Sequence, residues 1–495
     1  MKYKIPEEIK RIYDTLKNAG YETYLVGGCV RDLLLGKKPK DWDITTNARP
    51  EKIEKLYEKS FYENQFGTVS AITDSEDETL KVVEITPYRL ESKYSDKRHP
   101  DAVKFTGKLE DDLKRRDFTV NAMALNLETQ TGSVFPVSGF MLYDFFGGQE
   151  DLKKAVIRAV GKPTERFEED ALRIMRALRL AAELDFSIEE KTSQAIKEKG
   201  ELLDIIAKER IKDELVKIIM SDRPQKGLES MRETGILKYV LPELEEGWGV
   251  TQNKEHIFKV WEHNLRSLEH AVKNNYSLEI RMAALLHDVG KPRAKRGEGP
   301  DSTFYSHDVI GGKMAKEILF RLKFSKKFTE TVSKLVRYHL FFSDTDVITL
   351  SAVRRLVRNV GPENIWDLIK VRFCDRMGMG RPKDRPFRLR KYQAMVEQVL
   401  RDPISVKMLK INGNRLMKIT NLEPGPKIGD ILNILLEDVL DDPELNTAEY
   451  LENKAKELAV LPDQELKKLS KEAKKKSITV EEEVIGEIKG KYYVK

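Results

Sequence analysis

The spacing of apolar residues changes once along the chain, near residue 150. Before that point, short β-type runs stand between Gly, Pro or Asp residues, which is typical of strands. After it, apolar residues recur every three to four positions, which is typical of helices that bury one face. The predicted strands are YETYLVGG (21–28), WDITT (42–46), SAIT (70–73), LKVVEITPYRL (80–90) and MALNLET (123–129). The predicted helices include EEDALRIMRALRLAAEL (168–184), RIKDELVKIIM (210–220), EIRMAALLHDVG (279–290), TVSKLVRYHLFF (331–342) and LSAVRRLVRNV (350–360).

These patterns predict an α+β protein, in which an α/β head precedes an elongated all-helical body. Pro242 and Pro403 mark boundaries within the body. We therefore expect a head, a helical neck, a second helical domain and a helical tail. Their predicted ranges are 1–150, 151–245, 246–400 and 401–495.

Two segments near the C-terminus have their own patterns. The run 478–495 (ITVEEEVIGEIKGKYYVK) is the one strand-like stretch after residue 150, and we expect a short hairpin there. The run 466–476 (LKKLSKEAKKK) is basic, and a solvated helix face is favoured over a nucleic-acid contact. The last forty residues match no pattern that we can name.

Composition narrows the class of protein only a little. Hydrophobic residues make up 40% and charged residues 34% of the 495 residues, which fits a globular chain of several domains. A net charge of +6 permits a polyanionic partner without requiring one. The two cysteines, Cys29 and Cys374, exclude a disulfide framework and fit a reducing compartment. No apolar run reaches the length of a membrane span and the first 20 residues read as an amphipathic helix, so we expect a cytoplasmic protein.

The first candidate site follows the first predicted strand. That strand ends in Gly27 and Gly28, where a phosphate can approach the backbone N–H groups, and Arg31 is available to the same phosphate. Asp41 and Asp43 stand two apart on the next strand and so project to one side. Two convergent carboxylates suit Mg²⁺ when a triphosphate and water supply the remaining ligands. A lone Asp-x-Asp is more often a solvated turn, but the upstream Gly-Gly and Arg-Asp favour a nucleotidyl transfer site.

These residues carry a family resemblance. The stretch 27–53 (GGCVRDLLLGKKPKDWDITTNARPEKI) closely resembles the first motif of the class II, bacterial-type CCA-adding tRNA nucleotidyltransferases and of the related bacterial poly(A) polymerases. The stretch 115–126 (RRDFTVNAMALN) resembles their second motif. The resemblance implies a polymerase-beta-like head, in which Arg116, Asp117 and Asn121 bind the nucleotide. Arg116 and Asp117 would favour a ribonucleotide through its 2′-hydroxyl.

The resemblance extends to three further elements. Glu84 lies on a strand where the superfamily often has a third catalytic carboxylate, although a solvated edge position is an equal alternative. The stretch YDFFGG, with Asp144, Gly147 and Gly148, resembles the third motif, which is assigned to the hinge between head and neck. The stretch KERIKDELVKII (208–219) resembles the fifth motif, which supports the neck.

A base-selecting pair is expected at the start of the neck. Asp170 and Arg173 are three apart on a predicted helix and so share a face. An acceptor beside a guanidinium fits the Watson–Crick edges of C and A alike. A simple pair within the helix is the common alternative, but Glu169, Asp170 and Arg173 match the Glu-Asp-x-x-Arg motif of the family. Arg176 and Arg179 are expected to extend the same nucleotide-binding surface.

Two other segments bear on the substrate. The segment Tyr88–Phe105 resembles the loop that lets full CCA-adding members change from C to A, and enzymes that add only CC tend to lack it. The segment 404–447 resembles the tail domain of the family, and Lys410, Asn412 and Lys427 would suit phosphate contacts to a tRNA elbow. The alternative for the tail is a helical domain whose Pro-Gly-Pro turn starts a helix.

A second metal site is predicted in the helical body. His263, the dipeptide His287-Asp288 and Asp375 follow the order of the HD-domain phosphohydrolases. Two imidazoles and two carboxylates can hold a transition metal whose bound water attacks a phosphate ester. Lys291 and the basic run that follows it are candidates for substrate phosphate.

His307 and His339 lie between these ligands in the sequence. They are candidates for a larger metal site, but a packed or surface histidine is the favoured interpretation of each. The family implies phosphatase or 2′,3′-cyclic phosphodiesterase activity for such a domain.

The favoured function is template-independent addition of C, C and A to the 3′ end of tRNA from CTP and ATP with Mg²⁺. Addition of A only or of CC only stays open, and so does poly(A) addition, although the HD ligands disfavour the last. A chain that acts mainly as an HD phosphohydrolase, or as a non-catalytic RNA-binding module, is disfavoured by the intact Asp41-Trp42-Asp43 and Arg115-Arg116-Asp117 sequences. The expected partners are tRNA, ATP and CTP, with no membrane and no obligatory protein partner.

Overall fold

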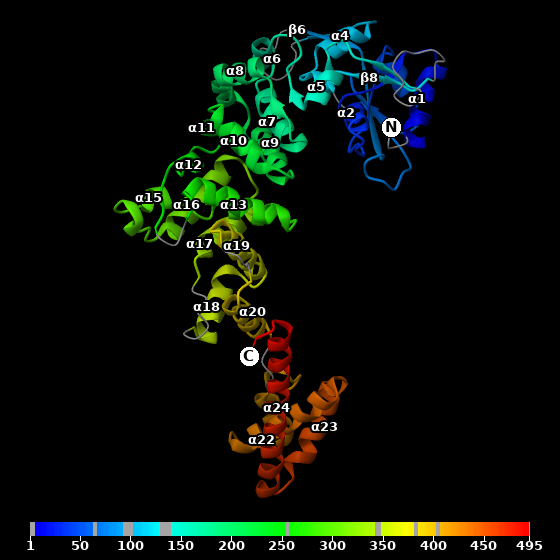
Figure 1. Ribbon diagram of the computed structural model, residues 1–495. Helices are drawn as coiled ribbons and strands as arrows, with labels where there is room; N and C mark the ends of the chain where they lie inside the picture. The colour runs from blue at the N-terminus through cyan, green and yellow to red at the C-terminus, as the bar shows by residue number, and fades with distance from the viewer. Residues whose placement is uncertain are drawn as a thin grey trace. The chain divides into compact units, whose positions relative to one another are not determined.

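The computed structural model describes eight stretches of the chain, namely residues 5–62, 67–92, 102–128, 140–253, 257–341, 348–380, 385–401 and 406–494. The chain forms two compact units. The first comprises Met1–His339 and Lys370–Arg381, and the second comprises Leu340–Ile369 and Pro382–Lys495. Strands gather in the N-terminal part of the first unit and helices form the rest (Figure 1). The prediction of an α/β head on a helical body is confirmed.

The head is built on a mixed seven-stranded sheet in the order β3-β4-β5-β2-β1-β8-β9. Only β2 and β5 run parallel, and every other neighbouring pair is antiparallel. Helix α1 (Glu7–Asn18) contacts β1 and buries apolar residues at helical spacing, including Ile9, Ile12 and Leu16. The strands are β1 (Thr23–Val26), β2 (Asp43–Thr46), β3 (Ser60–Tyr62), β4 (Val69–Ile72), β5 (Val82–Pro87), β8 (Ala124–Asn126) and β9 (Met141–Tyr143).

The predicted strand at 80–90 is two strands. The ladder between β5 and β2 ends at Pro87, and β6 (Arg89–Ser92) then pairs with β7 (Ala102–Phe105) as a separate two-stranded sheet. Proline has no N–H to donate, so it suits the end of a strand. The rest of the predicted C-to-A segment, residues 93–101, lies outside the described residues.

The body of the first unit is helical. Of the five predicted helices, four are present there in full or in part as α7, α9, α14 and α17, and the fifth is α18 of the second unit. One short parallel pair, β10 (Val156–Ile157) with β11 (Ser187–Ile188), also lies in the body. The expectation of no strand between residue 150 and the tail was wrong. Strands of two residues are too short to show an alternation of apolar and polar residues. The helices that position functional side chains are α4 (Leu109–Lys114), α6 (Pro163–Glu169), α7 (Leu172–Leu184), α9 (Lys208–Met220), α13 (Val260–Lys273), α14 (Leu278–Leu286), α16 (His307–Arg321), α17 (Lys326–Tyr338) and α19 (Ile365–Gly378).

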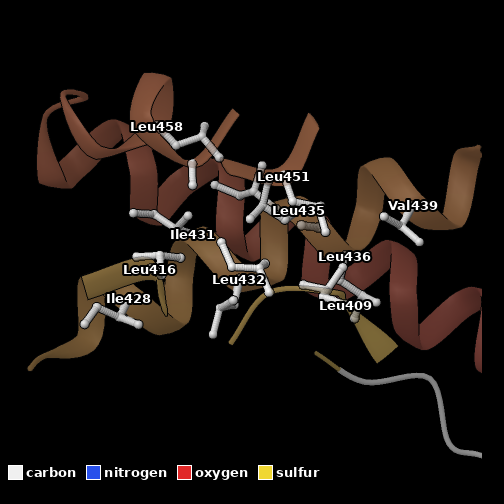
Figure 2. Close-up of a cluster of buried hydrophobic side chains, with 14 of the residues drawn as sticks. Leu409, Leu416, Ile428, Ile431, Leu432, Leu435, Leu436, Val439, Leu451 and Leu458 are labelled. Carbon is white, nitrogen blue, oxygen red and sulfur yellow. The ribbon is translucent and has the colours of Figure 1, made fainter. Parts of the chain in front are cut away.

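The second unit has its own apolar core, in which side chains of α21, α22, α23 and α24 converge (Figure 2). Leu416, Ile431, Leu435 and Leu451 are all inaccessible to solvent there. The helices are α18 (Leu350–Val360), α20 (Phe387–Leu400), α21 (Gly413–Thr420), α22 (Pro426–Asp441), α23 (Ala448–Ala459) and α24 (Asp463–Lys491).

The predicted C-terminal hairpin is wrong, because residues 463–491 form the single helix α24. The β-branched start of the segment suggested a strand. Val484 and Ile488, however, are four apart and pack with Ala394 of α20, which is the spacing of a helix. The basic run 466–476 lies on this helix, and its lysines are exposed.

No helix in the part of the chain that the structure describes combines the length and the apolar character that a membrane span requires.

Candidate functional site

Two carboxylates lie in register where β2 and β5 run side by side in the head, and a third lies two residues before β2. Asp43 begins β2 and stands in register with Glu84 of β5, so the two side chains share one face of the sheet. Asp41 lies two residues before Asp43 and is exposed. Burial raises the pKa of Asp43, the Arg116 guanidinium opposes this shift, and Asp41 adds to it. The site therefore concentrates negative charge that a divalent cation would relieve.

Gly27 lets two functional side chains approach the backbone. Its φ of 81° is a conformation that favours glycine. A Cβ atom at this position would lie 3.1 Å from both Arg116 Nη1 and Asp43 Oδ2. Gly28 begins the short helix α2 (Gly28–Leu34), so the Gly-Gly turn joins β1 to α2 beside the carboxylates.

Arg116 is held by Asp112, a residue that the sequence analysis did not single out. Asp112 is fully buried on α4, and burial opposes its ionisation, but Arg115 and Arg116 lower its pKa below the usual value. Its Oδ2 accepts hydrogen bonds from Arg116 Nη2 at 3.4 Å and from Thr45 Oγ1 at 3.2 Å. The spacing of four residues between Asp112 and Arg116 was the available signal, but the sequence does not show that Asp112 is buried.

The second motif links the head to the neck. Arg176 of α7 donates to Asp117 Oδ2 through Nε at 2.8 Å and approaches it through Nη2 at 2.6 Å. Burial opposes ionisation of Asp117, but Arg176 outweighs it and brings the pKa to about 2. Asn121 donates to Asp117 Oδ1 at 3.3 Å and accepts from Arg31 Nη1 at 2.8 Å. Four of the predicted nucleotide-binding residues therefore form one connected polar network.

The third motif has a structural part in this arrangement. Asp144 accepts hydrogen bonds from the backbone N–H groups of Gly148 and Gln149 at the start of α5 (Gly148–Lys154). A Cβ at Gly148 would lie 2.3 Å from the carbonyl oxygen of Thr119 in the second motif. The glycine thus allows α5 to pack directly on the turn that carries Asn121.

The predicted helix at 168–184 is broken at Asp170, so the expectation that Asp170 and Arg173 share a helix face is wrong. Asp170 has extended backbone angles between α6 and α7. Its Oδ1 accepts from the N–H of Leu172, and this local hydrogen bond favours a helix start over a continuous helix. Arg173 instead contacts Glu169 Oε2 at 2.7 Å and the carbonyl of Arg115 at 3.2 Å.

Arg176 and Arg179 also differ from the expected shared surface. Arg176 faces Asp117, as described above, whereas Arg179 lies 3.0 Å from Glu214 of α9. Both partners of the second pair are largely buried. Arg179 therefore stabilises the packing of the neck helices.

The predicted metal ligands of the body converge from three segments. His263 on α13, His287 and Asp288 after α14, and Asp375 on α19 form a set that we call the HD ligand set. His263 Nε2 lies 2.9 Å from His287 Nε2, 3.2 Å from Asp288 Oδ2 and 3.3 Å from Asp375 Oδ1. All four residues are buried. Two imidazoles and two carboxylates at these distances form a donor set suited to a transition metal ion.

The charges of the HD ligand set also favour a cation. Burial opposes protonation of His287, but Asp288 and Asp375 raise its pKa to about 10. Burial opposes ionisation of both carboxyl groups as well, yet Lys291 beside Asp288 and Arg372 beside Asp375 hold their pKa values well below the usual range. Both carboxylates are therefore ionised at neutral pH and face imidazole nitrogens.

Lys291 lies within this site. Its Nζ is 2.6 Å from Asp288 Oδ2 and 2.5 Å from Gln252 Oε1, and the side chain is buried. The following basic run points elsewhere, because Arg293 pairs with the exposed Glu246.

His307 and His339 are neither surface residues nor packed against apolar groups alone. Both are buried, and their Nε2 atoms lie 3.3 Å and 3.6 Å from Asp288 Oδ1. The structure thus brings them to the larger site that the sequence analysis had considered and disfavoured.

In the tail, two of the three residues predicted to contact tRNA have partners within the chain. Asn412 accepts from the N–H of Arg415 and so caps α21. Lys427 Nζ donates to the carbonyl of Leu461. Lys410 has an exposed side chain.

Three models of protein families match successive parts of the chain. Family models match for the Poly A polymerase head domain at residues 23–158, the probable RNA and SrmB-binding site of polymerase A at 185–247, and the HD domain at 260–379. The solved structure of the Bacillus stearothermophilus CCA-adding enzyme in complex with CTP matches with a TM-score of 0.59 and 25% identity, over 92% of this chain and 98% of that one.

Curated relatives are CCA-adding enzymes. The Lactobacillus helveticus enzyme is 49% identical over 42% of this chain and 48% of its own length, so the match spans about half of that relative. The Bacillus cytotoxicus enzyme is 33% identical over 430 residues, which are 87% of this chain and 92% of that protein. The ordered family matches, the shared fold and this near full-length similarity agree: the chain belongs to the family of CCA-adding enzymes.

Proposed function

We propose that the head adds C, C and A to the 3′ end of tRNA, using CTP and ATP without a nucleic-acid template. The observation that carries this proposal is the approach of Asp43 and Arg116 to Gly27, with Glu84 in register with Asp43 on the next strand. Carboxylates for metal ions stand there next to a guanidinium for a triphosphate. Membership of the CCA-adding family supplies the substrate.

Asp41 and Asp43 would hold Mg²⁺, with Glu84 as the third carboxylate. Bound Mg²⁺ supplies activation of the terminal 3′-hydroxyl and neutralises charge on the departing pyrophosphate. Arg31 and Arg116 bind the triphosphate, since guanidinium groups match phosphate oxygens bidentately. This division of roles agrees with the raised pKa of Asp43, which a bound cation would lower again.

The polar network of the second motif would bind the ribose. Asp117 keeps an ionised carboxylate because Arg176 is paired with it. Such a carboxylate can accept a hydrogen bond from a 2′-hydroxyl, which a deoxyribonucleotide lacks. Asn121 holds Asp117 and Arg31 together, so ribose and triphosphate binding are connected through one side chain.

Asp170 and Arg173 would select the base from the break between α6 and α7. The extended backbone at Asp170 places its carboxylate outside both helices, where it can accept from an exocyclic amino group. Arg173 can donate to a ring nitrogen when its contact with Glu169 is exchanged for the base. Asp170 then contacts the base from just before α7 and Arg173 from the first turn of that helix, so the two residues do not share a helix face.

The enzyme assay uses tRNA transcripts that end in the discriminator base, in C or in CC, each with one labelled nucleotide and Mg²⁺. We expect C incorporation on the first two transcripts and A on the third. An adenosine ladder on all three would identify a poly(A) polymerase. The absence of incorporation with any nucleotide would contradict the proposal. The segment 88–105 favours full CCA addition over addition of A alone or CC alone.

We further propose a phosphohydrolase activity at the HD ligand set. Buried, converging donor atoms and the adjacent Lys291 suit a transition metal ion with a phosphate ester. The test is hydrolysis of a 2′,3′-cyclic nucleotide or a 2′-nucleotide by metal-loaded protein. Absence of hydrolysis together with absence of bound metal would contradict this activity.

The compartment that we propose is the cytoplasm. Cys29 and Cys374 are both buried and form no disulfide, and burial raises the pKa of Cys29 to about 12. Cysteines that form no disulfide fit a reducing environment.

A further inference from the structure

Three apolar side chains of the head sheet are exposed next to one another. Phe61 of β3, Ile72 of β4 and Val82 of β5 are 46%, 44% and 45% exposed. Ile72 and Val82 are direct partners across their strands, and Phe61 lies diagonal to Ile72, a separation that an aromatic side chain can span. We call these three residues the edge patch. Exposed apolar side chains that stand singly are ordinary, whereas a contiguous group marks an interaction site.

The edge patch shares its face of the sheet with the carboxylates. Phe61 of β3 pairs with Ser70 of β4, which in turn pairs with Glu84 of β5. Glu84 pairs with Asp43 of β2. Direct partners on neighbouring strands point to the same face, so one row of side chains leads from Phe61 to Asp43. Val82 lies two residues before Glu84 and therefore on this face as well.

The core of these strands is on the opposite face. Val69 of β4 and Val83 and Ile85 of β5 are fully buried and alternate with the exposed positions. Tyr62, the residue after Phe61 on β3, pairs with Val69 and so points to this opposite face. The edge patch therefore does not belong to the core, and its exposure requires another explanation.

The proposed transfer chemistry decides from which side the acceptor RNA arrives. Arg116 and Asp43 approach Gly27 after β1, and Arg31 lies on α2, which follows directly. The departing pyrophosphate is therefore on the β1 side of β2. Attacking and leaving oxygens are roughly in line in phosphoryl transfer. Since β5 flanks β2 on the other side, the attacking 3′-hydroxyl comes over Glu84, next to the edge patch.

The surroundings of the edge patch favour a base over a phosphate. The turn between β4 and β5 is acidic, and three of its carboxylates pair with lysines, as Lys38–Asp77, Lys59–Asp74 and Lys81–Glu78. Glu76 adds a fourth negative charge to the turn, so the region does not attract a phosphate. The flat face of a base is uncharged and stacks on aromatic side chains. The chemistry of the edge patch therefore suits a nucleobase.

We propose that the edge patch is the platform on which the 3′-terminal base of the acceptor RNA stacks, so that the 3′-hydroxyl is held over Glu84. This inference rests on the proposed nucleotide transfer and adds to it the route of the acceptor strand. Phe61 supplies the ring, and Ile72 and Val82 extend the apolar surface across β4 and β5. Stacking does not read the edge of a base, so it tolerates every base. Such a platform suits an acceptor whose last base changes between additions.

The test measures steady-state transfer of A to a tRNA transcript that ends in CC. Phe61→Ala should raise KM for the transcript by about tenfold, which lies within the range for loss of one base stack. KM for ATP should stay within about twofold, because the nucleotide binds elsewhere. Phe61→Trp keeps an aromatic ring and should stay near the parent value. Tyr62→Ala, the neighbour on the opposite face, is the matched control and should change neither constant.

A transcript with an abasic 3′-terminal nucleotide shows whether the lost contact is with the base. Removal of this base should raise KM for the transcript in the parent protein. It should raise KM less in Phe61→Ala, because there the contact is already lost. Equal penalties in the two proteins would overturn the platform. An unchanged KM for the transcript in Phe61→Ala, or an equal rise in Tyr62→Ala, would overturn it as well.

Binding without transfer separates this inference from the proposed function. Fluorescence anisotropy of the labelled transcript, without nucleotide, measures Kd for the parent protein and the same variants. Val82→Thr keeps a β-branched side chain on the strand and should weaken binding in the same direction as Phe61→Ala. Weaker binding by both, with Tyr62→Ala unchanged, in a protein that transfers no nucleotide would contradict the proposed function and leave the platform standing. Normal transfer with equal Kd and equal KM in all variants would overturn the platform and leave the proposed function standing.

Discussion

At the scale of single residues, charged side chains of the head are oriented by neighbouring side chains of opposite charge. Arg116 and the carboxylate of Asp43 both approach Gly27, and the buried Asp112 of α4 holds Arg116 there. Asp112 itself does not reach the nucleotide, so it is a positioning residue. Sequence motifs identified Arg116 but not the residue that orients it.

We predict that Asp112→Asn slows nucleotide transfer by about 100-fold, the cost of displacing a binding group by about 1 Å. Arg116 would lose its buried counter-charge, so it would no longer be held in place to bind the triphosphate. Single-turnover incorporation of labelled CTP measures the effect, and KM for CTP should rise as well. Glu110→Gln, an exposed carboxylate on the same helix, is the control. Equal rates for the two variants would show that Asp112 does not position Arg116.

A second residue prediction concerns pH. The pKa of Asp117 is about 2 in the folded chain, below its value in an unfolded chain, because Arg176 outweighs burial. The pair therefore stabilises the fold above about pH 4, and this contribution disappears as the pH falls through about 2. The difference in melting temperature between the parent protein and Asp117→Asn should be largest above pH 4 and should shrink toward pH 2. A difference in melting temperature that is constant over this range would mean that Arg176 does not lower the pKa of Asp117.

At the scale of elements, helix boundaries explain what periodicity missed. Apolar spacing alone predicted one helix at 168–184, because it does not show the hydrogen bond that the Asp170 carboxylate accepts from the N–H of Leu172 at the start of α7. The same spacing, applied to Val484 and Ile488, would have given the C-terminal helix instead of a hairpin. Long, strongly periodic helices such as α9 and α18 were predicted within a few residues, whereas the two-residue strands β10 and β11 carry no period at all.

The break between α6 and α7 leads to a prediction about base choice. Asp170→Ala should lose discrimination between CTP, ATP and the other two nucleotides while retaining part of the transfer rate. The loss follows because no acceptor is left for the exocyclic amino group. Competition among all four labelled nucleotides on a tRNA ending in CC measures this, with the exposed Glu165→Gln on α6 as control. Unchanged selectivity in Asp170→Ala would mean that the base is read elsewhere.

At the scale of the whole molecule, the chain carries two separate sets of side chains that we propose to bind metal ions. In the head, Asp43 and Glu84 come from neighbouring strands, and Asp41 lies two residues before Asp43. The histidines around Asp288 come from four helices and loops, and only three-dimensional packing reveals that His307 and His339 join them. Arg176 and Asp117 meet through long-range packing, and the sequence predicted both as nucleotide-binding residues without predicting that they pair.

The separation of the two sets predicts separable activities. Asp43→Ala should reduce nucleotide transfer to background and leave hydrolysis of a 2′,3′-cyclic nucleotide within about twofold of the parent protein. Asp77→Asn, a carboxylate of the head that pairs with Lys38, should change neither activity. Parallel assays of one preparation measure both. A simultaneous loss of both activities in Asp43→Ala would contradict the separation.

The central claim is tested most directly by sequencing the 3′ end that the protein makes. A tRNA transcript that ends at the discriminator base is incubated with Mg²⁺ and all four nucleotides, and the products are sequenced. We predict that synthesis stops after three added residues and that the added sequence is CCA. A tail of adenosines, a stop after CC, or a transcript left unextended would contradict the account.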